Sequence, residues 1–181
     1  MTQPAENYVP AAMAEHFRRQ ALRVWLVTFA LVFLWDIAII AAPLLREAGL
    51  VTAAAPLYTF FGFLCHQIPG RSFHIDSEPL AVCSRCFGVY FGLWAGVGVY
   101  PLWHSIEDVT PLPRFWLFAS LVPMGVDWAL TFFGIWENTL FSRFLTGFIV
   151  GVACATFIVP AVVEIIRNFS RRRAFQRVNI H

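Results

Sequence analysis

The sequence contains no lysine and few charged residues of either sign, which excludes several classes of protein. Charged residues make up 13% of the 181 positions and apolar residues 59%, whereas soluble domains contain about 25% and about 45–50%. The mean hydropathy of +0.65 agrees with this composition. A soluble globular domain and a disordered chain are therefore both excluded. The net charge of +2 is too small to indicate binding to nucleic acid.

The motifs of several enzyme classes are also absent. The sequence has no glycine-rich phosphate loop, no Gly-x-Ser-x-Gly nucleophile elbow and no His-Glu-x-x-His metal motif. No two histidines lie at facing depths in the apolar stretches, which argues against haem binding. The sequence also lacks the inverted repeat that is typical of transporters. The residues suited to catalysis or metal binding are instead three neighbouring cysteines and a few charged residues within apolar stretches.

Apolar stretches long enough to cross a bilayer dominate the sequence. A helix needs about 20 apolar residues to cross, and four stretches meet this length: about 22–43, 86–103, 114–134 and 140–164. The uncharged stretch 48–65 contains two glycines and a proline and barely reaches spanning length. Residues 12–23 are predicted to form an interfacial helix. The expected fold is all-α, a polytopic membrane helix bundle in a lipid bilayer.

Arginines near the ends of the spans predict the orientation. Arg18, Arg19 and Arg23 precede the first span, and five arginines follow the last one. The positive-inside rule then places both termini in the cytoplasm, which requires an even number of crossings. Stretch 48–65 is therefore predicted to be re-entrant or interfacial rather than a fifth span. The predicted organisation is a cytoplasmic segment at 1–21, a single membrane domain at 22–166 and a basic cytoplasmic tail at 167–181, in a bacterial plasma (inner) membrane.

Glycines recur every four residues in two of the spans. They stand at 88, 92 and 96 in the second span and at 147 and 151 in the fourth. This spacing puts the glycines of each span on one helix face, where another backbone can approach closely. We expect these glycine faces to serve helix packing within one chain rather than a dimer interface, and we expect the second and fourth spans to be central in the bundle.

Three of the four cysteines fall in one region of the chain. Cys65 is followed by His66, and Cys83 and Cys86 open the second span, where positions i and i+3 share a helix face. The start of a helix favours thiolate. Three thiols and an imidazole match the Cys₃His set of tetrahedral zinc sites, so these four residues are the predicted ligands of a metal ion, zinc by ligand type. His74 is a predicted substitute or outer partner.

Other chemistry stays open for these cysteines. A disulfide is the structural alternative, because the outer face of a bacterial membrane is oxidising. Three cysteines would leave one unpaired, and catalytic thiol chemistry is the third possibility. Cys154 stands alone in the fourth span and is expected to be a small buried apolar side chain.

Charged residues within the spans predict a polar site at the same face. Asp36 and Asp127 each lie seven residues before the end of a span, about 10 Å deep at 1.5 Å per residue. Arg143 lies about one turn into the fourth span. Charges at this depth cost several kcal/mol unless they are paired, so an ion pair between Asp127 and Arg143 is expected. Asn138 would complete its hydrogen bonding.

The pair has either of two predicted roles. It fixes helix register, or Asp127 and Arg143 take part in catalysis. Asp36 has only Arg143 or Arg71 as a basic partner, or lies at a hydrated cavity. The Cys-His loop ends, the second span begins, the third span ends and the fourth span begins at the same membrane face. The Cys/His cluster is therefore predicted to share a pocket with Asp127, Asn138 and Arg143.

At these residues the sequence resembles the DUF2085 family of predicted small membrane proteins. The resemblance covers about residues 60–151, with Phe87 standing where the family is expected to have threonine. It rests on the segments Cys65-His66-Gln67-Ile68-Pro69, Arg71-Ser72-Phe73 and Val82-Cys83-Ser84-Arg85-Cys86-Phe87-Gly88-Val89-Tyr90, followed by Pro123, Asp127, Asn138, Arg143, Thr146 and Gly147. The family name records no activity. The resemblance therefore implies that these residues act together as one cluster, but it does not indicate a reaction.

Four functions remain in competition. The first is a membrane metal-binding protein. The second is a metal-dependent hydrolase or transferase at the membrane interface, in which Arg143 and Arg71 hold an anionic group such as a lipid phosphate. The third is a thiol–disulfide redox protein that uses Cys83 and Cys86. The fourth is a scaffold subunit of a larger membrane complex.

Overall fold

The computed structural model describes residues 11–178 except 107, 109 and 111, and the side chains of residues 15–170 outside these gaps. Nearly all of its regular structure is helical. The elements in chain order are α1 (Ala11–Glu47), α2 (Val51–Gly62), the 3-10 helix η1 (Pro69–Arg71), β1 (His74–Ile75), β2 (Glu78–Pro79), α3 (Ser84–Trp103), α4 (Phe115–Phe132) and α5 (Leu140–Val178).

Four of these helices are long and apolar enough to cross a membrane. They are Glu15–Glu47 of α1, α3, α4 and Leu140–Ser170 of α5, which confirms the predicted helical membrane protein with four spans. The interfacial position of the helix at 12–23 stays a prediction. These residues form the first turns of α1 and continue without a break into the first span. They contain helix-forming Ala, Glu, Leu and Arg residues and neither proline nor glycine, so nothing interrupts the helix before the apolar stretch.

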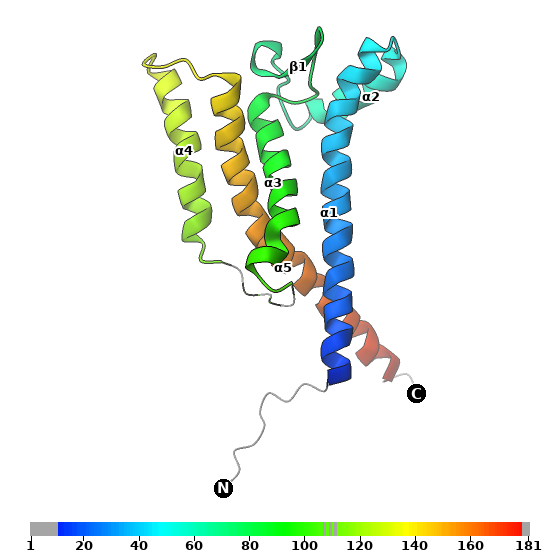
Figure 1. The fold of residues 1–181 in the computed structure, drawn as a ribbon. Helices are drawn as coiled ribbons and strands as arrows, with labels where there is room; N and C mark the ends of the chain where they lie inside the picture. Colours follow the sequence, from blue (N-terminus) through cyan, green and yellow to red (C-terminus); the bar gives the residue numbers. More distant parts are fainter. Residues whose placement is uncertain (1–10, 107, 109, 111, 179–181) are drawn as a thin grey trace.

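The short helix α2 explains the ambiguous stretch 48–65. Its 12 residues span about 18 Å at 1.5 Å per residue, too short for a hydrocarbon core of about 30 Å. Figure 1 shows α2 beside the end of α1 and the β1–β2 hairpin, all at the upper end of the bundle. The stretch therefore stays at one end, as predicted. The start of α1 and the end of α5 lie together at the opposite end (Figure 1).

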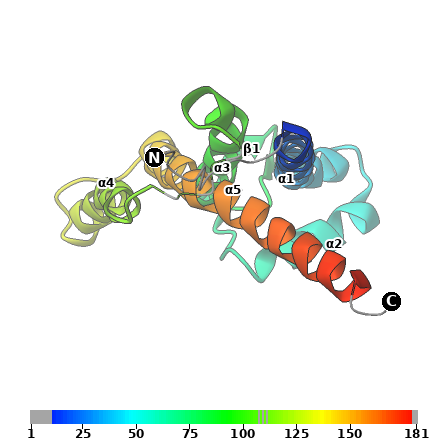
Figure 2. The same cartoon turned by 90° about the horizontal axis from the view of Figure 1, so that it is seen from below.

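Glycine contacts bring α3 and α5 together, which agrees with the packing within one chain that the glycine spacing favours. This pair packs more extensively than any other pair of described helices. A Cβ atom on Gly88 would overlap the backbone of Phe144, and a Cβ atom on Gly147 would overlap the carbonyl oxygen of Arg85. The next glycines along each row repeat these contacts one turn further on. Viewed from below, α5 runs diagonally across the bundle, and α4 lies at one side (Figure 2).

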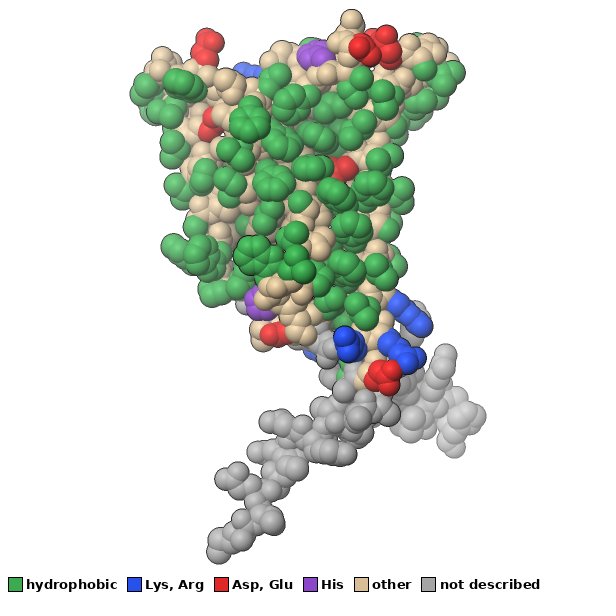
Figure 3. Space-filling view, viewed as in Figure 1, with side chains coloured by type: hydrophobic (Ala, Val, Ile, Leu, Met, Phe, Trp, Pro, Cys, Tyr) green, Lys and Arg blue, Asp and Glu red, His purple; other side chains and the backbone are tan. Residues whose placement is uncertain are grey.

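The flanks of the bundle are apolar, as a lipid environment requires. Figure 3 shows hydrophobic side chains covering the flank between the two ends, with arginine side chains gathered at the lower end. The spanning part of α4 has only 6% of its residues buried, and Trp116, Phe118 and Phe132 are more than half exposed. Apolar surface on this scale is stable only against lipid or another protein.

Candidate metal centre

The three predicted thiol ligands come together at the upper end of the bundle. The sulfur atoms of Cys65, Cys83 and Cys86 all lie within 4.8 Å of one another. All three cysteines are free thiols, and Cys65 is buried. In a tetrahedral site with Zn–S bonds of about 2.3 Å, the sulfurs lie about 3.8 Å apart. Small side-chain movements are therefore enough to bring these thiols to one ion.

Local structure fixes each cysteine separately. Cys65 continues the last turn of α2, and its N–H donates to Phe61 O at 2.9 Å. Cys83 is the N-cap of α3 and Cys86 lies in the first turn of that helix. The N–H of Cys83 donates to the Sγ of Cys65 at 3.2 Å, which joins the two chain segments directly at the sulfur.

Hydrogen bonding to Cys65 favours the charged form of its thiol. The thiols of Cys83 and Cys86 hydrogen-bond to Cys65 and hold its pKa well below the usual range, against the opposing effect of burial. Backbone N–H groups of Cys83 and Gln67 lower this pKa further. Because the thiolate is the form that binds metal, Cys65 is prepared as a ligand by its surroundings.

Gln67 positions the loop, a role that the sequence analysis did not assign. Its side-chain amide donates to the carbonyl oxygens of Tyr58 and Ala81, both at 2.7 Å. These carbonyls belong to α2 and to the strand-like segment that leads into Cys83. The backbone φ of Gln67 is 48°, a left-handed conformation that is uncommon outside glycine. A glutamine two residues after a ligand was visible in the sequence, but its two distant acceptors were not.

Further contacts hold the segments around the cysteines against α1 and α2. The hydroxyl of Tyr58 donates to Pro79 O at 2.6 Å. Nη1 of Arg46 lies 3.1 Å from Oε2 of Glu78, and the Arg46 guanidinium lies 5.0 Å from the centre of the Tyr58 ring. The residues between the hairpin and Cys83 are at most 4% exposed: Leu80, Ala81 and Val82. The chain segment that leads into Cys83 is therefore held in place by buried packing contacts.

Three predicted site residues lie away from the sulfurs. His66 is exposed and is not among the side chains that meet at the sulfurs, although it lines the same cavity. His74 is exposed in β1 and lines neither of the cavities beside the cysteines. Asp36 lies eleven residues before the end of α1, about 16 Å along the helix. It is 4% exposed, and its oxygens have no hydrogen-bond partner among the described residues.

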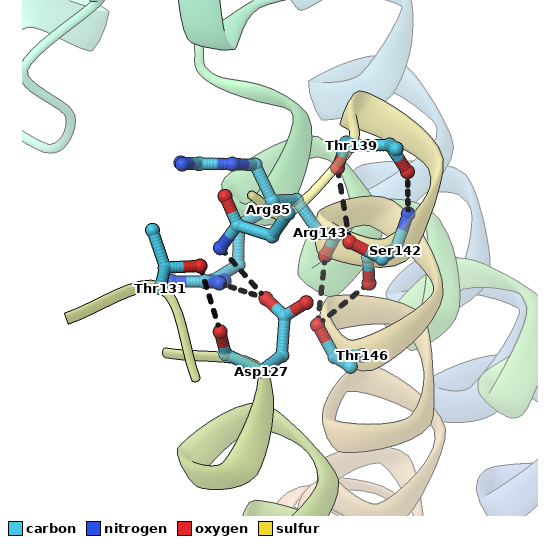
Figure 4. A network of polar contacts seen from close by, with 8 residues as sticks. Arg85, Asp127, Thr131, Thr139, Ser142, Arg143 and Thr146 are labelled. Carbon is cyan, nitrogen blue, oxygen red and sulfur yellow. Dashed lines mark hydrogen bonds and ion pairs between the residues drawn. The ribbon is translucent and has the colours of Figure 1, made fainter. Parts of the chain in front are cut away.

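The ion pair of Asp127 differs from the predicted one. Asp127 forms an ion pair with Arg85 of α3 through its Oδ2 atom. The same oxygen accepts a hydrogen bond from Asn138 Nδ2 at 3.0 Å. Figure 4 shows this pair, with Arg143 on the neighbouring helix α5. The expected pair with Arg143 was wrong because a similar depth in the membrane does not determine which arginine reaches the carboxylate. The glycine contact of α3 with α5 brings Arg85 closer.

Two neighbouring cavities share three arginines. One cavity of about 320 Å³ is lined by the three cysteines together with His66, Arg71, Arg85 and Arg143. The second, of about 240 Å³, is lined by the same three arginines and by Trp128, Thr131, Phe132 and Asn138. The thiols therefore open onto a strongly cationic space.

Comparison with known proteins assigns this region to a family. Residues 65–157 match the family described as a predicted membrane protein (DUF2085). The chain belongs to this family. An uncharacterized protein of Methanocaldococcus jannaschii is 38% identical over 110 residues, which are 61% of this chain and 70% of that protein. An uncharacterized protein of Methanothermobacter thermautotrophicus is 31% identical over 97 residues, 52% of this chain and 84% of that protein. No solved structure matches the chain.

The DUF2085 segment contains nearly all of the site. It starts at Cys65, includes the three arginines of the cavities and reaches beyond the glycine contacts of α5. Asp36 lies outside this segment, as it also lies outside both cavities. The family segment thus coincides with α3, α4, the apolar half of α5 and the loop that carries the first cysteine.

Proposed function

We propose that this DUF2085 protein binds a transition-metal ion, zinc by the chemistry of its ligands, through Cys65, Cys83 and Cys86. The observation that carries the proposal is the meeting of three free thiols within 4.8 Å, from segments 18 residues or more apart, with a backbone N–H donated to one of the sulfurs. Soft thiolate ligands select zinc, copper(I) or iron–sulfur clusters. A tetrahedral Cys-rich set favours zinc.

The fourth coordination position of such an ion is open to the cationic cavity. Structural zinc sites have four protein ligands, whereas catalytic ones keep a position for water or substrate. Three sulfurs meet here, and His66 stands at the wall of the same cavity rather than beside them. A metal-dependent hydrolase or transferase is therefore the enzymatic form of this proposal. In it, Arg71 and Arg143 bind an anionic substrate. Asp127 accepts a hydrogen bond from Asn138 and positions Arg85 through their ion pair.

Metal analysis with single substitutions tests the proposed ligands. Protein purified in a neutral detergent is expected to contain about one zinc ion per chain, because three thiolates bind it tightly. Replacement of Cys65, Cys83 or Cys86 by serine is expected to abolish stoichiometric metal, and His66→Ala to weaken it less. Cys154→Ser is the matched control, since this cysteine lies apart in α5. Elemental analysis by mass spectrometry measures the content.

Two results would contradict the metal proposal. Stoichiometric metal that survives all three serine substitutions would remove these residues as ligands. A metal-free wild-type protein in which Cys83 and Cys86 cycle between dithiol and disulfide would favour the redox function, for which the sulfurs are also close enough. Thiol counting before and after addition of dithiothreitol distinguishes the two cases.

The proposed location is a plasma membrane with both termini in the cytoplasm. Arginines near the start of α1 and the end of α5 support this orientation through the positive-inside rule. The cysteine end of the bundle then faces outward. In that compartment a bound metal would keep the thiols from oxidising to disulfides.

A further inference from the structure

Positive charge at the two cavities exceeds the negative charge provided by the described side chains. Arg71, Arg85 and Arg143 line both cavities. Asp127 forms an ion pair with Arg85, and Glu78 with Arg46. Within the part of the chain that the structure describes, no carboxylate lies within ion-pair distance of Arg71 or Arg143. Two guanidinium groups therefore face the cavities without a carboxylate partner among the described residues.

The proposed metal centre does not remove this excess. Three thiolates around a dication carry a single negative charge, and Asp127 carries another, against three arginines. Arg143 lines both cavities together with Arg71 and Arg85, and it is half-buried near the start of a spanning helix. Partly desolvated like charges are costly, so binding of an anion between them is favourable.

The directions of the donors indicate which anion fits. Arg71 comes from η1, Arg85 from α3 and Arg143 from α5, so the guanidinium groups approach from three separate elements. Asn138 and Thr131 line the same cavity and add neutral polar groups. A carboxylate offers two oxygens in one plane, whereas a phosphate group offers oxygens in several directions and matches the arginine fork. Trp128 and Phe132 form the remaining wall and are exposed on the lipid-facing helix α4.

We propose that Arg71 and Arg143, together with Arg85, bind the phosphate group of a ligand beside the three-cysteine site. This inference deepens the proposed function, because it names the class of ligand that lies next to the metal, but the arginine site stands on its own geometry. The phosphate group comes either from a lipid headgroup, which the aromatic wall favours, or from a soluble phosphate.

Binding measurements on charge-removing variants test the site. Inorganic phosphate is titrated calorimetrically into the full-length protein in neutral detergent. Retention of phosphatidic acid against phosphatidylcholine is measured by native mass spectrometry from nanodiscs of each lipid. Arg71→Gln and Arg143→Gln are each expected to lower affinity for the bound probe by about tenfold to a hundredfold, as for the loss of a hydrogen bond to a charged group. Because Arg71 is exposed in a loop, its substitution leaves the helix packing intact.

Arg46→Gln is the matched control. Arg46 also lies at the upper end of the bundle, but it pairs with Glu78 and lines neither cavity, so phosphate binding should be unchanged. Binding of phosphatidic acid without inorganic phosphate would assign the lipid source, and the converse would assign a soluble ligand. The inference is overturned if neither probe binds the wild type, or if Arg46→Gln weakens binding as much as the cavity variants.

Metal content measured on the same samples separates this inference from the proposed function. Phosphate binding lost in the arginine variants with metal retained supports both sites. Metal present in a wild type that binds neither probe overturns the phosphate site alone. Phosphate binding in a protein that holds no metal overturns the metal centre alone.

Discussion

Gln67 shows how a single side chain determines the geometry of the cysteine cluster. Its side-chain amide donates to two carbonyl oxygens, one from α2 and one two residues before Cys83, and its backbone N–H helps to lower the pKa of the Cys65 thiol. The left-handed φ of 48° places the side chain where both carbonyls are within reach. Residues that orient ligands in this way affect metal affinity strongly, although they do not touch the ion.

Replacement of Gln67 by alanine is expected to loosen the centre. The substitution leaves two carbonyl groups without their donor, which costs about 1–3 kcal/mol of unfolding free energy. Metal affinity is expected to fall by about 10–100-fold, the range for partners that orient ligands. Unfolding by sodium dodecyl sulfate in mixed micelles and competition with a chelator measure the two effects.

Gln20→Ala provides the comparison for this prediction. Gln20 also donates through its amide, to Ser170 Oγ at 2.8 Å, but the contact is exposed and joins α1 to α5 far from the cysteines. Its loss should change unfolding free energy by less than about 0.5 kcal/mol and leave metal affinity unaltered. Wild-type metal affinity in Gln67→Ala would show that the loop is positioned by other contacts.

The contact of α3 with α5 is the element on which the site depends. The backbone of Arg85, between two of the cysteines, lies against Gly147 so closely that a Cβ atom has no room. The same Arg85 binds Asp127 of α4, a helix that otherwise packs mainly on α5. One residue of α3 therefore joins the cysteine cluster to both of the following helices.

Gly147→Ala is expected to separate α3 from α5. Overpacking of a close helix contact costs about 1–3 kcal/mol, and the shift of Arg85 should also lower metal retention. Gly125→Ala in α4 is the matched control, because no atom lies within 4 Å of the added Cβ. There the removal of a helix glycine is expected to be neutral or to stabilise by about 0.5–1 kcal/mol. Equal unfolding free energies in detergent for the two variants would contradict the role of the glycine contact.

The whole molecule has its basic termini and its cysteine cluster at opposite ends. Arginines gather at the end where α1 starts and α5 ends (Figure 3). The start of α3, which carries Cys83 and Cys86, lies with α2 and the hairpin at the other end (Figure 1). An even number of spanning helices places both termini on one side. The side of the membrane on which the three thiols lie therefore follows from the orientation of the bundle.

Reporter fusions are expected to place the C-terminus in the cytoplasm. Green fluorescent protein after residue 181 should fluoresce and alkaline phosphatase there should be inactive, because arginines near span ends remain on the cytoplasmic side. Insertion of the same reporters in the turn at Asp76 and Ser77, between β1 and β2, should give the opposite signals. Active phosphatase at the C-terminus would reverse the orientation and put the thiols in the cytoplasm.

The sequence by itself determined the class of the molecule and the identity of its unusual residues. Four long apolar stretches specify four spanning helices, since hydrocarbon leaves the backbone few alternatives to a helix. The four-residue glycine spacing predicted which two helices have a face that another backbone can approach closely, and the structure shows that these two faces meet each other. The spacing of Cys83 and Cys86 likewise put two thiols at one helix start, because both signals are local and periodic.

Only the tertiary structure decided which distant groups meet. Asp127 pairs with Arg85 rather than Arg143, Asp36 lies apart from the cavities, and His66 lines the cavity without joining the sulfurs. These outcomes depend on helix rotation and on how closely two backbones approach. Neither quantity follows from the order of apolar and charged residues, because every one of these side chains is within reach of several partners until the helices pack.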